Sequence, residues 1–439
     1  MKSSSADDFH PVRTSDWWAL FLIVLAYSFY NLDKSLVSVL IEPIKGEFDL
    51  SDSQMGLMTG LATSVPFALA CIPVGMLADR VNRRNLLAVL VAGWSAVTGL
   101  TSLAANVTAL FASRIGIGLF EAGFTPVSLS SLSDRFPLRL RSTVMGLFSL
   151  GAAAGLFMGM AMGGFVADNW GWRAAFLIAG VPGLAIAALV VWTTSEPRRG
   201  QGDTPAASDG NAGLAAGLAH MMRDRALRHI ALGMTWGAAM LAVFAVWTPS
   251  LLRRSFELSG TSAGLQSGLI VGIGGALGAA AGGVIADRIG RGSLARKLVV
   301  PMVGVTASTV AGLAALLGGG GAAIAGVLLG MSAFFCQFYI GTCYGLAATL
   351  AGSNRRGVTL SVLLVSFNLI SYSLGSGLVG KVSDMLAPVH GTDSLRLAYA
   401  AAFAFCLVAL FHFQRAHADL SRREGTGERA ESHHVPAST

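Results

Sequence analysis

The chain of 439 residues consists mostly of long apolar stretches separated by short polar segments. A helix that spans a bilayer needs about 20 mostly apolar residues. The pattern therefore predicts an all-α membrane protein with twelve transmembrane helices. The predicted helices cover residues 17–41, 54–78, 85–104, 107–129, 142–167, 172–194, 226–252, 262–286, 294–317, 321–350, 357–383 and 394–414.

A motif of the first half recurs in the second half. GMLADRVNRR at 75–84 recurs as GVIADRIGRG at 283–292, and each copy follows an apolar helix. The repeat divides the helices into two bundles of six, as in many transporters built from parallel repeats. We expect a cytoplasmic tail at 1–16, bundles at 17–194 and 226–414, a cytoplasmic linker at 195–225 and a cytoplasmic tail at 415–439.

Composition and charge agree with this interpretation. With 53% hydrophobic and 13% charged residues, the chain does not have the composition of a soluble protein. The net charge of +7 is spread over short loops, so we expect no nucleic-acid partner. Most of the 31 Lys and Arg residues fall on one side of the predicted helices, which places both termini in the cytoplasm. Residues 1–16 have no apolar core of a signal peptide, so the first helix is expected to stay in the mature protein.

The sequence contains no motif of a metal site or of an enzyme. Its four cysteines lie inside apolar runs without the spacing of metal ligands, and no Walker-type phosphate-binding loop occurs. We therefore expect no metal, no cofactor and no catalytic residues.

Four charged residues inside the apolar runs of the first half mark the candidate site. Arg114 and Glu121 are seven positions apart, which is two helical turns, so they lie on the same side of one helix. Asp33 and Lys34 are neighbours in the first helix. Helix geometry places Asp33 and Arg114 at similar depth in the outer half of the membrane and Glu121 nearer the middle. Charges at such depth normally face a cavity or a partner.

This pattern favours a proton-coupling site. Arg114 stays charged, whereas a buried carboxylate takes a proton when its partner is lost or replaced. Glu121 would titrate as an anionic substrate competes for Arg114, and Asp33 would orient Arg114. The alternative is a static ion pair that fixes two helices. Lys34 lies about 100° around the helix from Asp33, so it either faces the cavity as a binding cation or extends outward.

The polar residues of the second half are neutral. A cavity that is charged on one side and apolar on the other suits an anion with an apolar body, although ordinary helix packing explains the same residues equally well. Together with the first half, the candidate substrate-binding residues are Tyr30, Asn31, Lys34, Arg114, Trp236, Tyr339, Tyr344 and Asn368.

The repeated motif predicts a cytoplasmic gate. Gly75 and Gly283 would let neighbouring helices approach closely. The aspartate of each copy would accept hydrogen bonds from helix N-termini or from arginines of the adjacent loop. Asn82 stands where the second copy has a glycine, and Asn tolerates positive φ better than most residues. The candidate gate residues are Gly75, Asp79, Arg80, Arg84, Gly283, Asp287, Arg288 and Arg291.

The motif resembles the signature loop of the major facilitator superfamily, here in both halves. Further strings, NLDK at 31–34, RIGIGLFEAGFTP from Arg114 and GWRAAFLIAGVPG from Gly171, resemble bacterial members of the spinster family over nearly the whole chain. The resemblance implies alternating access about a central cavity in the bacterial inner membrane. It also implies proton-coupled transport of a lysophospholipid or a related amphipathic anion. It carries over Asp33 and Glu121 as the carboxylates and Arg114 as the switching partner, while Lys34 replaces the arginine usual in the family.

Other functions are compatible with the same residues. Symporters of sugar acids and other small organic anions have a similar arrangement of Asp-Arg and Arg-x6-Glu. A sensor with this fold would bind a ligand without transporting it, and a channel-like facilitator would be indifferent to pH and to Glu121. The expected partners are the lipid bilayer, an anionic or amphipathic small molecule and protons.

Overall fold

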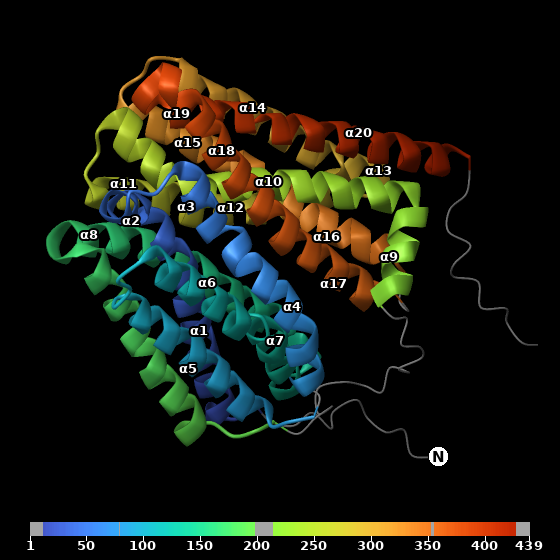
Figure 1. Ribbon diagram of the computed structural model, residues 1–439. Coiled ribbons are helices and arrows are strands. Elements are labelled where there is room, and N and C mark those ends of the chain that lie inside the picture. The colour runs from blue at the N-terminus through green and yellow to red at the C-terminus, as the bar shows by residue number, and fades with distance from the viewer. Residues whose placement is uncertain (1–11, 79, 198–213, 353–354, 427–439) are drawn as a thin grey trace, which may run out of the picture. The chain divides into compact units, whose positions relative to one another are not determined.

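The computed structural model describes residues 12–78, 80–197, 214–352 and 355–426. Within these ranges the chain is almost entirely helical and contains no strand (Figure 1). The predicted all-α class is therefore confirmed. The predicted N-terminal tail and the first part of the linker lie largely outside the described residues, and the last part of the linker forms helix α9. The first part of the predicted C-terminal tail, up to Gly425, belongs to helix α20.

The helices of the first half follow the predicted spans. They are α1 (Thr14–Val39), α2 (Ile41–Phe48), α3 (Asp52–Thr59), α4 (Leu61–Ala78), α5 (Arg83–Thr101), α6 (Val107–Glu121), α7 (Phe124–Arg135) and α8 (Leu138–Thr193). Gly171 has a φ of 83°, which interrupts the helical backbone of α8 between the fifth and sixth predicted spans.

The second half contains shorter helical pieces joined end to end. They are α9 (Leu214–Arg223), α10 (Arg225–Phe256), α11 (Gly260–Ser267), η1 (Gly268–Gly274), α12 (Gly275–Ile289), α13 (Leu294–Lys297), α14 (Val299–Leu317), α15 (Ala322–Cys336), α16 (Tyr339–Leu350), α17 (Arg356–Ser366), η2 (Phe367–Ser371), α18 (Tyr372–His390), η3 (Gly391–Asp393), α19 (Ser394–Ala402) and α20 (Ala404–Gly425). The segments η1 and η2 are π-helical, a conformation found often at functional sites.

Nine helical stretches in the described ranges are long and apolar enough to cross a membrane. Two of them, 139–193 and 362–425, are 55 and 64 residues long, so each has room for two spans. Helix α5, which begins with two arginines, is not among the nine. Each of the twelve predicted spans therefore corresponds to a helical part of the structure.

The chain forms two compact units. The first unit contains residues 1–208, 243–273 and 372–399, and the second contains residues 209–242, 274–371 and 400–439. The segments η1 and η2 end where the chain passes from one unit to the other. The predicted bundle boundaries stay a prediction, because the units group residues by contact rather than by chain order.

In the first unit, α1 packs along α8, and α5 packs against both α6 and α8 (Figure 1). Small residues allow this close approach, as is common between helices in lipid. A Cβ atom at Gly155 would collide with the carbonyl of Ser28, and one at Gly159 would collide with the carbonyl of Leu32. Small residues four positions apart on α8 thus hold the part of α1 that carries the charged residues.

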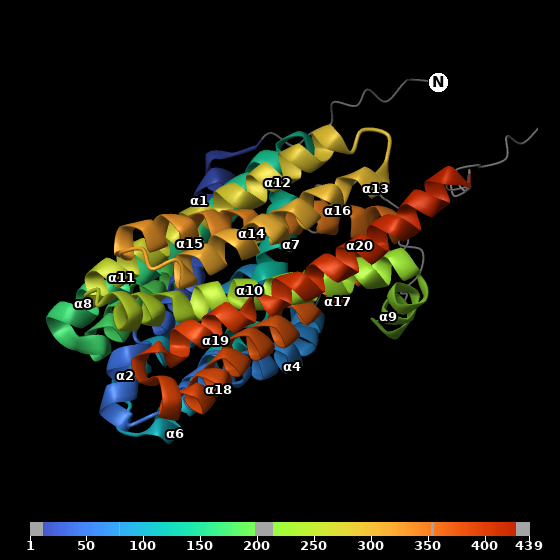
Figure 2. The same ribbon diagram turned by 90° about the horizontal axis from the view of Figure 1, so that it is seen from above.

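In the second unit, α14 packs against α15 and α20 (Figure 2). Glycines again allow close contact, here with aromatic residues. Gly312 of α14 lies against the ring of Phe403, and Gly282 of α12 lies against the backbone of Phe338. The core of this unit is therefore built from neutral, closely packed helices.

Candidate functional site

Lys34 of α1 and Glu121 of α6 form the contact at the centre of the candidate site. The Lys34 Nζ lies 3.6 Å from a Glu121 carboxylate oxygen and donates a hydrogen bond of 2.7 Å to the Tyr30 hydroxyl. Glu121 is 0% exposed, and neither of its carboxylate oxygens has a hydrogen-bond partner in the described chain. Lys34 therefore points toward the buried carboxylate, and its role as a substrate-binding cation stays a prediction.

Asp33 and Arg114 form the second part of this group. The Asp33 Oδ2 accepts a hydrogen bond of 2.9 Å from the Thr98 hydroxyl of α5, while its Oδ1 and one terminal nitrogen of Arg114 have no hydrogen-bond partner in the described chain. The two side chains are 3% and 4% exposed and are close enough to interact electrostatically. The Arg114 guanidinium also lies 5.3 Å from the centre of the Phe176 ring. No carboxylate lies within 4.0 Å of it among the described residues.

We call Asp33, Lys34, Arg114 and Glu121 the α1–α6 cluster. Three of its four members are almost completely buried, so their charges are separated from water. Arg114 and Glu121 are close enough to interact electrostatically. The shortest contact between a cation and a carboxylate of the cluster is the one between Lys34 and Glu121. The cluster thus contains two carboxylates and two cations with few fixed hydrogen bonds between them.

Aromatic side chains line the cluster on the α1 side. The Tyr27 and Phe148 rings stack at 3.9 Å, and the Tyr30 ring lies 5.8 Å from the Phe124 ring. The Lys34 Nζ is 4.3 Å from the centre of the Tyr30 ring. Among the other predicted binding residues, Asn31 donates a hydrogen bond to the backbone of its own helix. The cation is therefore held between one carboxylate and an aromatic surface.

The predicted binding residues of the second half lie in the second unit. Tyr339 is fully buried, with its ring 6.4 Å from the Phe413 ring, and its hydroxyl has no hydrogen-bond partner in the described chain. The Trp236 ring lies 5.6 Å from the Phe405 ring. Tyr344 is partly buried, and the side chain of Asn368 lies outside the described residues. Their role in binding stays a prediction, with helix packing as the alternative for Tyr339.

The two predicted gate glycines differ in their surroundings. A Cβ atom at Gly75 or at Gly283 would itself meet no atom within 4 Å, but a Cβ atom at Gly341 of α16 would lie 3.5 Å from the Gly283 Cα, so α12 and α16 approach closely there. The role of both glycines in a gate stays a prediction. Asp287 accepts a hydrogen bond of 2.8 Å from Lys297, not from a helix N-terminus or an arginine of its loop. Asp79 lies outside the described residues. Arg80, Arg288 and Arg291 are exposed.

Asn82 has a different role from the one expected. Its φ is −67°, so no positive φ is needed there, and its side chain caps α5 by accepting a hydrogen bond of 3.0 Å from the Asn85 backbone. Arg84 donates to the Thr194 carbonyl. Its neighbour Arg83, which the sequence analysis did not select, is bound to Asp134 at 2.6 Å and to Glu196 at 3.3 Å. An ionic network thus joins the loops on this side of the first unit.

A second ionic network lies at the opposite ends of the helices of the first unit, and the sequence analysis did not predict it. Asp52, at the start of α3, is 2% exposed and accepts two hydrogen bonds of 2.7 Å from Arg254 of α10. It also accepts hydrogen bonds from Lys45 at 2.5 Å and from Ser383 at 2.7 Å. Both carboxylate oxygens of Asp52 therefore accept hydrogen bonds, and the guanidinium of Arg254 binds them in a bidentate geometry that favours strong pairing.

Two more carboxylates complete this arrangement. Arg254 Nε donates to Glu42 at 2.9 Å, and Asp384 of α18 accepts hydrogen bonds from the backbone N–H groups of Asp52 and Ser53 at the N-terminus of α3. We call Glu42, Lys45, Asp52, Arg254 and Asp384 the outer ionic network. Nearby, hydrogen bonds from Arg173 and Trp172 lower the pKa of Glu47 below its usual value.

The residues that sequence reasoning missed gave weak signals. Thr98 is one hydroxyl in an apolar helix, and Phe176 is one of 23 phenylalanines. Asp52 and Arg254 stand at the ends of predicted spans, where charged residues are ordinary. Only the folded chain shows that these ends meet.

The sequence is similar to those of known membrane transport proteins. Residues 23–376 match the family model described as Major Facilitator Superfamily. An MFS-type efflux pump of Mycolicibacterium smegmatis is 28% identical over 399 residues, covering 89% of each chain. The sphingosine-1-phosphate transporter SPNS2 of Danio rerio is 26% identical, covering 51% of this chain and 45% of that protein.

A solved structure is similar over almost the whole chain. It is the crystal structure of a bacterial homolog to the human lysosomal transporter spinster, in an inward-facing and unoccupied conformation. The TM-score is 0.83 at 25% identity, with 93% of this chain and 98% of that chain covered.

Proposed function

Because the chain belongs to the Major Facilitator Superfamily, whose members are transporters and not enzymes, we propose that it is a proton-coupled secondary transporter of an amphipathic anion. Its relatives include spinster proteins and transporters of organic anions. We further propose that protons are the coupling ion, that the residues of the α1–α6 cluster act in coupling, and that both termini lie in the cytoplasm of a bacterial cell.

The contact between Lys34 and Glu121 carries the proposal. A carboxylate that is fully buried, makes no hydrogen bond in the described chain and has one ammonium at 3.6 Å is costly to keep charged. It remains charged only while that cation, or Arg114 beside it, compensates for it. A competing anion removes this compensation, and a proton then replaces it. Substrate binding and protonation of Glu121 are thereby linked.

The four charged residues act in this order. The anionic group of the substrate binds Lys34 and Arg114, and Glu121 takes up a proton as it loses its cation. Asp33, held by Thr98, keeps Arg114 in position. Release of the substrate lets the cations return to Glu121, which loses its proton. Each step changes ionic partners without leaving an uncompensated charge in the membrane.

The outer ionic network closes one side of the transporter in this proposal. It ties α3 to the end of α10 and to α18 through Asp52, Arg254 and Asp384. The breaking of these bonds would open the outer side, and their formation would leave the cytoplasmic side as the route of exchange. The similarity to an inward-facing spinster homolog supports this assignment.

The aromatic side chains around Lys34 support an amphipathic substrate. Tyr30 and Phe67 both lie near the Lys34 ammonium, at 4.3 Å and 5.4 Å from their ring centres. An anion held there would contact apolar ring surface directly. The sphingosine-1-phosphate transporter SPNS2 of Danio rerio, whose name indicates transport of a lipid phosphate, is 26% identical over about half of this chain.

A small organic anion is the second candidate substrate. A probable L-galactonate transporter of Escherichia coli is 26% identical, covering 87% of this chain and 84% of that protein. A hydroxylated sugar acid needs several free hydrogen-bond partners, whereas polar side chains of the second unit such as Thr309, Thr342 and Ser371 already donate to backbone carbonyls. This difference is why we prefer the amphipathic anion.

The test is uptake by purified protein in liposomes with an imposed pH gradient. The substrates are a labelled lysophospholipid, a fatty acid and galactonate, each measured with and without the gradient. Accumulation of lysophospholipid or fatty acid that disappears when a proton ionophore collapses the gradient supports the proposal. Gradient-driven accumulation of galactonate alone supports the second candidate, and uptake that is indifferent to pH contradicts proton coupling for both.

A further inference from the structure

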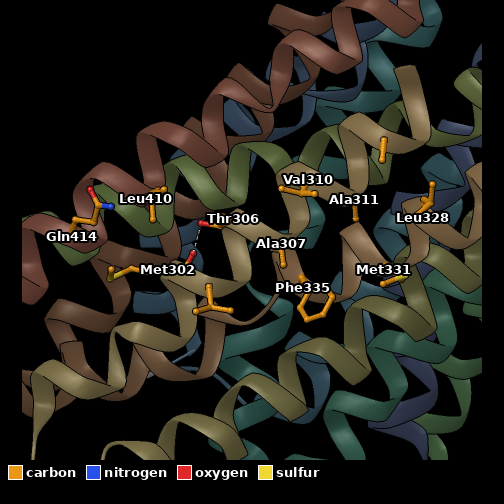
Figure 3. Close-up of a pocket in the computed structure, with 12 residues that line it drawn as sticks. Met302, Thr306, Ala307, Val310, Ala311, Leu328, Met331, Phe335, Leu410 and Gln414 are labelled. Atoms are coloured by element: carbon orange, nitrogen blue, oxygen red, sulfur yellow. Dashed lines mark hydrogen bonds between the residues drawn. The ribbon is translucent and has the colours of Figure 1, made fainter. Parts of the chain in front are cut away.

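An apolar groove runs along the surface of the second unit between α14, α15 and α20 (Figure 3). Its volume is about 670 Å³, and it is open along one side. Several of its lining residues are large, apolar and exposed, among them Val303, Val310 and Met331. In a chain that spans a membrane, such a surface faces the hydrocarbon of the bilayer.

The length of the groove matches one leaflet. Along α14 its lining extends from Met302 to Ala314, which is about 18 Å of helix at 1.5 Å per residue. The hydrocarbon of one leaflet is about 15 Å thick, half of a core of about 30 Å. A single extended acyl chain would therefore lie along the groove from end to end.

The polar atoms of the groove are at one end. Thr306 donates its hydroxyl to the carbonyl of Met302 at 2.8 Å, so it is satisfied within its own helix. Gln414 of α20 lies at the same end as Met302, away from Leu328 and Met331 (Figure 3). The groove thus has an apolar body and one polar mouth.

Three arginines stand beyond this mouth. Arg296 lies in the short helix α13, seven residues before Val303. On α20, Arg415 follows Gln414 directly and Arg422 lies about two turns beyond Gln414. None of the three forms an ion pair within the described ranges, and the Arg415 guanidinium rests 5.2 Å from the Phe411 ring. By contrast, Arg423 on the same helix is bound to both Asp224 and Asp419.

The acidic residue near the end of α20, Glu424, is also engaged. Glu424 accepts hydrogen bonds from Ser293 and from the backbone N–H groups of Leu294 and Ala295 at the start of α13. These bonds, and those of Arg423 to Asp224, anchor the end of α20 beside α13. Glu424 is also close enough to Arg296 to interact with its charge, while Arg415 and Arg422 have no ion-pair partner within the described ranges.

We propose that this groove binds one anionic glycerophospholipid of the surrounding bilayer. An acyl chain lies along α14, and the phosphate lies at the mouth between Arg296 and Arg415, within reach of Gln414 and Arg422. Guanidinium groups bind phosphate in a bidentate geometry, and arginines near a membrane surface attract anionic lipids. This site is separate from the α1–α6 cluster and does not depend on the proposed transport function.

The test uses full-length protein in detergent with phosphatidylglycerol and phosphatidylcholine of identical acyl chains. Native mass spectrometry counts the bound lipid. We expect one phosphatidylglycerol per chain, bound more tightly than phosphatidylcholine. The variants Arg296→Gln and Arg415→Gln should each weaken phosphatidylglycerol binding by about 5-fold, which corresponds to about 1 kcal/mol per arginine. The control Arg253→Gln, at the far end of α10, should leave binding unchanged.

The groove itself is tested by filling it. Ala311→Trp places a large side chain in the groove, whereas Ala323→Trp places the same side chain on an exposed position of α15 that does not line it. Loss of bound lipid in Ala311→Trp with retention in Ala323→Trp supports the site. Equal binding of the two lipids, full retention in Ala311→Trp, or equal loss in both tryptophan variants would overturn it. A melting curve of each variant confirms that it is folded.

Discussion

The α1–α6 cluster and the outer ionic network both contain buried carboxylates of the first unit, but they differ in how these carboxylates are paired. In the outer ionic network, Asp52 accepts four hydrogen bonds, two of them from Arg254. In the α1–α6 cluster, Glu121 makes none in the described chain and has its nearest cation at 3.6 Å. Asp33 accepts one hydrogen bond, from Thr98.

The difference separates a structural role from a role in coupling. Asp52 is a carboxylate in a bidentate ion pair, with both of its oxygens hydrogen-bonded. Such a pair keeps the carboxylate charged and fixes its geometry. A buried carboxylate with loose partners can exchange a cation for a proton at little cost in contacts. We therefore expect the outer ionic network to set which side of the transporter is closed, and the α1–α6 cluster to link substrate to protons.

The largest effect is expected for Glu121→Gln. The amide cannot exchange a proton, so accumulation of substrate driven by a pH gradient should be abolished, while exchange of substrate for substrate stays partly intact. Uptake and exchange in liposomes measure the two activities. The matched control is Glu47→Gln, an exposed position outside both groups, which should accumulate substrate as the wild type does. Normal accumulation by Glu121→Gln would show that coupling occurs elsewhere.

Replacement of the buried aspartates Asp52 and Asp33 by asparagine should affect different properties, stability for Asp52 and transport for Asp33. Asp52→Asn removes one of the two carboxylates bound to Arg254, the one that is almost completely buried, and loss of a buried ion-pair partner typically destabilises by about 3 kcal/mol. Asp33→Asn keeps the oxygen that Thr98 binds and removes a charge with few contacts. We expect a clearly lower melting temperature for Asp52→Asn, and near-normal melting with reduced transport for Asp33→Asn. Equal loss of stability in both variants would remove the distinction between the two groups.

A smaller effect is expected for Lys34→Met. Without the ammonium at 3.6 Å, Glu121 keeps its proton to higher pH, so the pH profile of gradient-driven transport should move upward by about one unit. Initial uptake rates between pH 5 and 9 would show the shift. Lys34→Arg serves as the control, because it preserves the charge and should leave the profile near that of the wild type. An unchanged profile in Lys34→Met would mean that Arg114 alone compensates Glu121.

The smallest effect is expected for Thr98→Val. It removes one hydroxyl donor from Asp33, a loss of about 1 kcal/mol, and should lower the transport rate by about 5-fold through misplacement of Arg114. The matched control is Thr101→Val on the same helix, whose hydroxyl donates to the carbonyl of Val97. The idea that Asp33 needs this donor fails if the two variants have the same rate.

Much of this arrangement could be predicted from the sequence, because lipid restricts what a chain can do. Apolar runs of the required length identify helices, and a charge inside such a run is conspicuous, as for Arg114 and Glu121. The break between two spans inside α8 was also expected, although nothing in the pattern indicated a positive φ at Gly171. The tolerance of Asn for positive φ plays no part at Asn82, because its φ is −67° and its side chain caps α5.

The pairings could not be predicted in the same way. Which cation lies nearest Glu121 depends on the rotation of α1 against α6, and a rotation of 100° exchanges Asp33 for Lys34. The bonds of Asp52 to Arg254 join positions 202 residues apart, and both residues look like ordinary loop charges in the sequence. The apolar groove of the second unit is equally hidden, since its lining comes from three helices, one of which, α20, is distant from the other two in the sequence.

The central claim is that binding of an anion to the α1–α6 cluster is accompanied by proton uptake at Glu121. Calorimetric titration of the purified protein with its substrate, repeated in buffers of different ionisation enthalpy, measures the protons taken up on binding. The account predicts uptake by the wild type near neutral pH and none by Glu121→Gln, which should still bind the substrate. The same number of protons taken up by both proteins would contradict it.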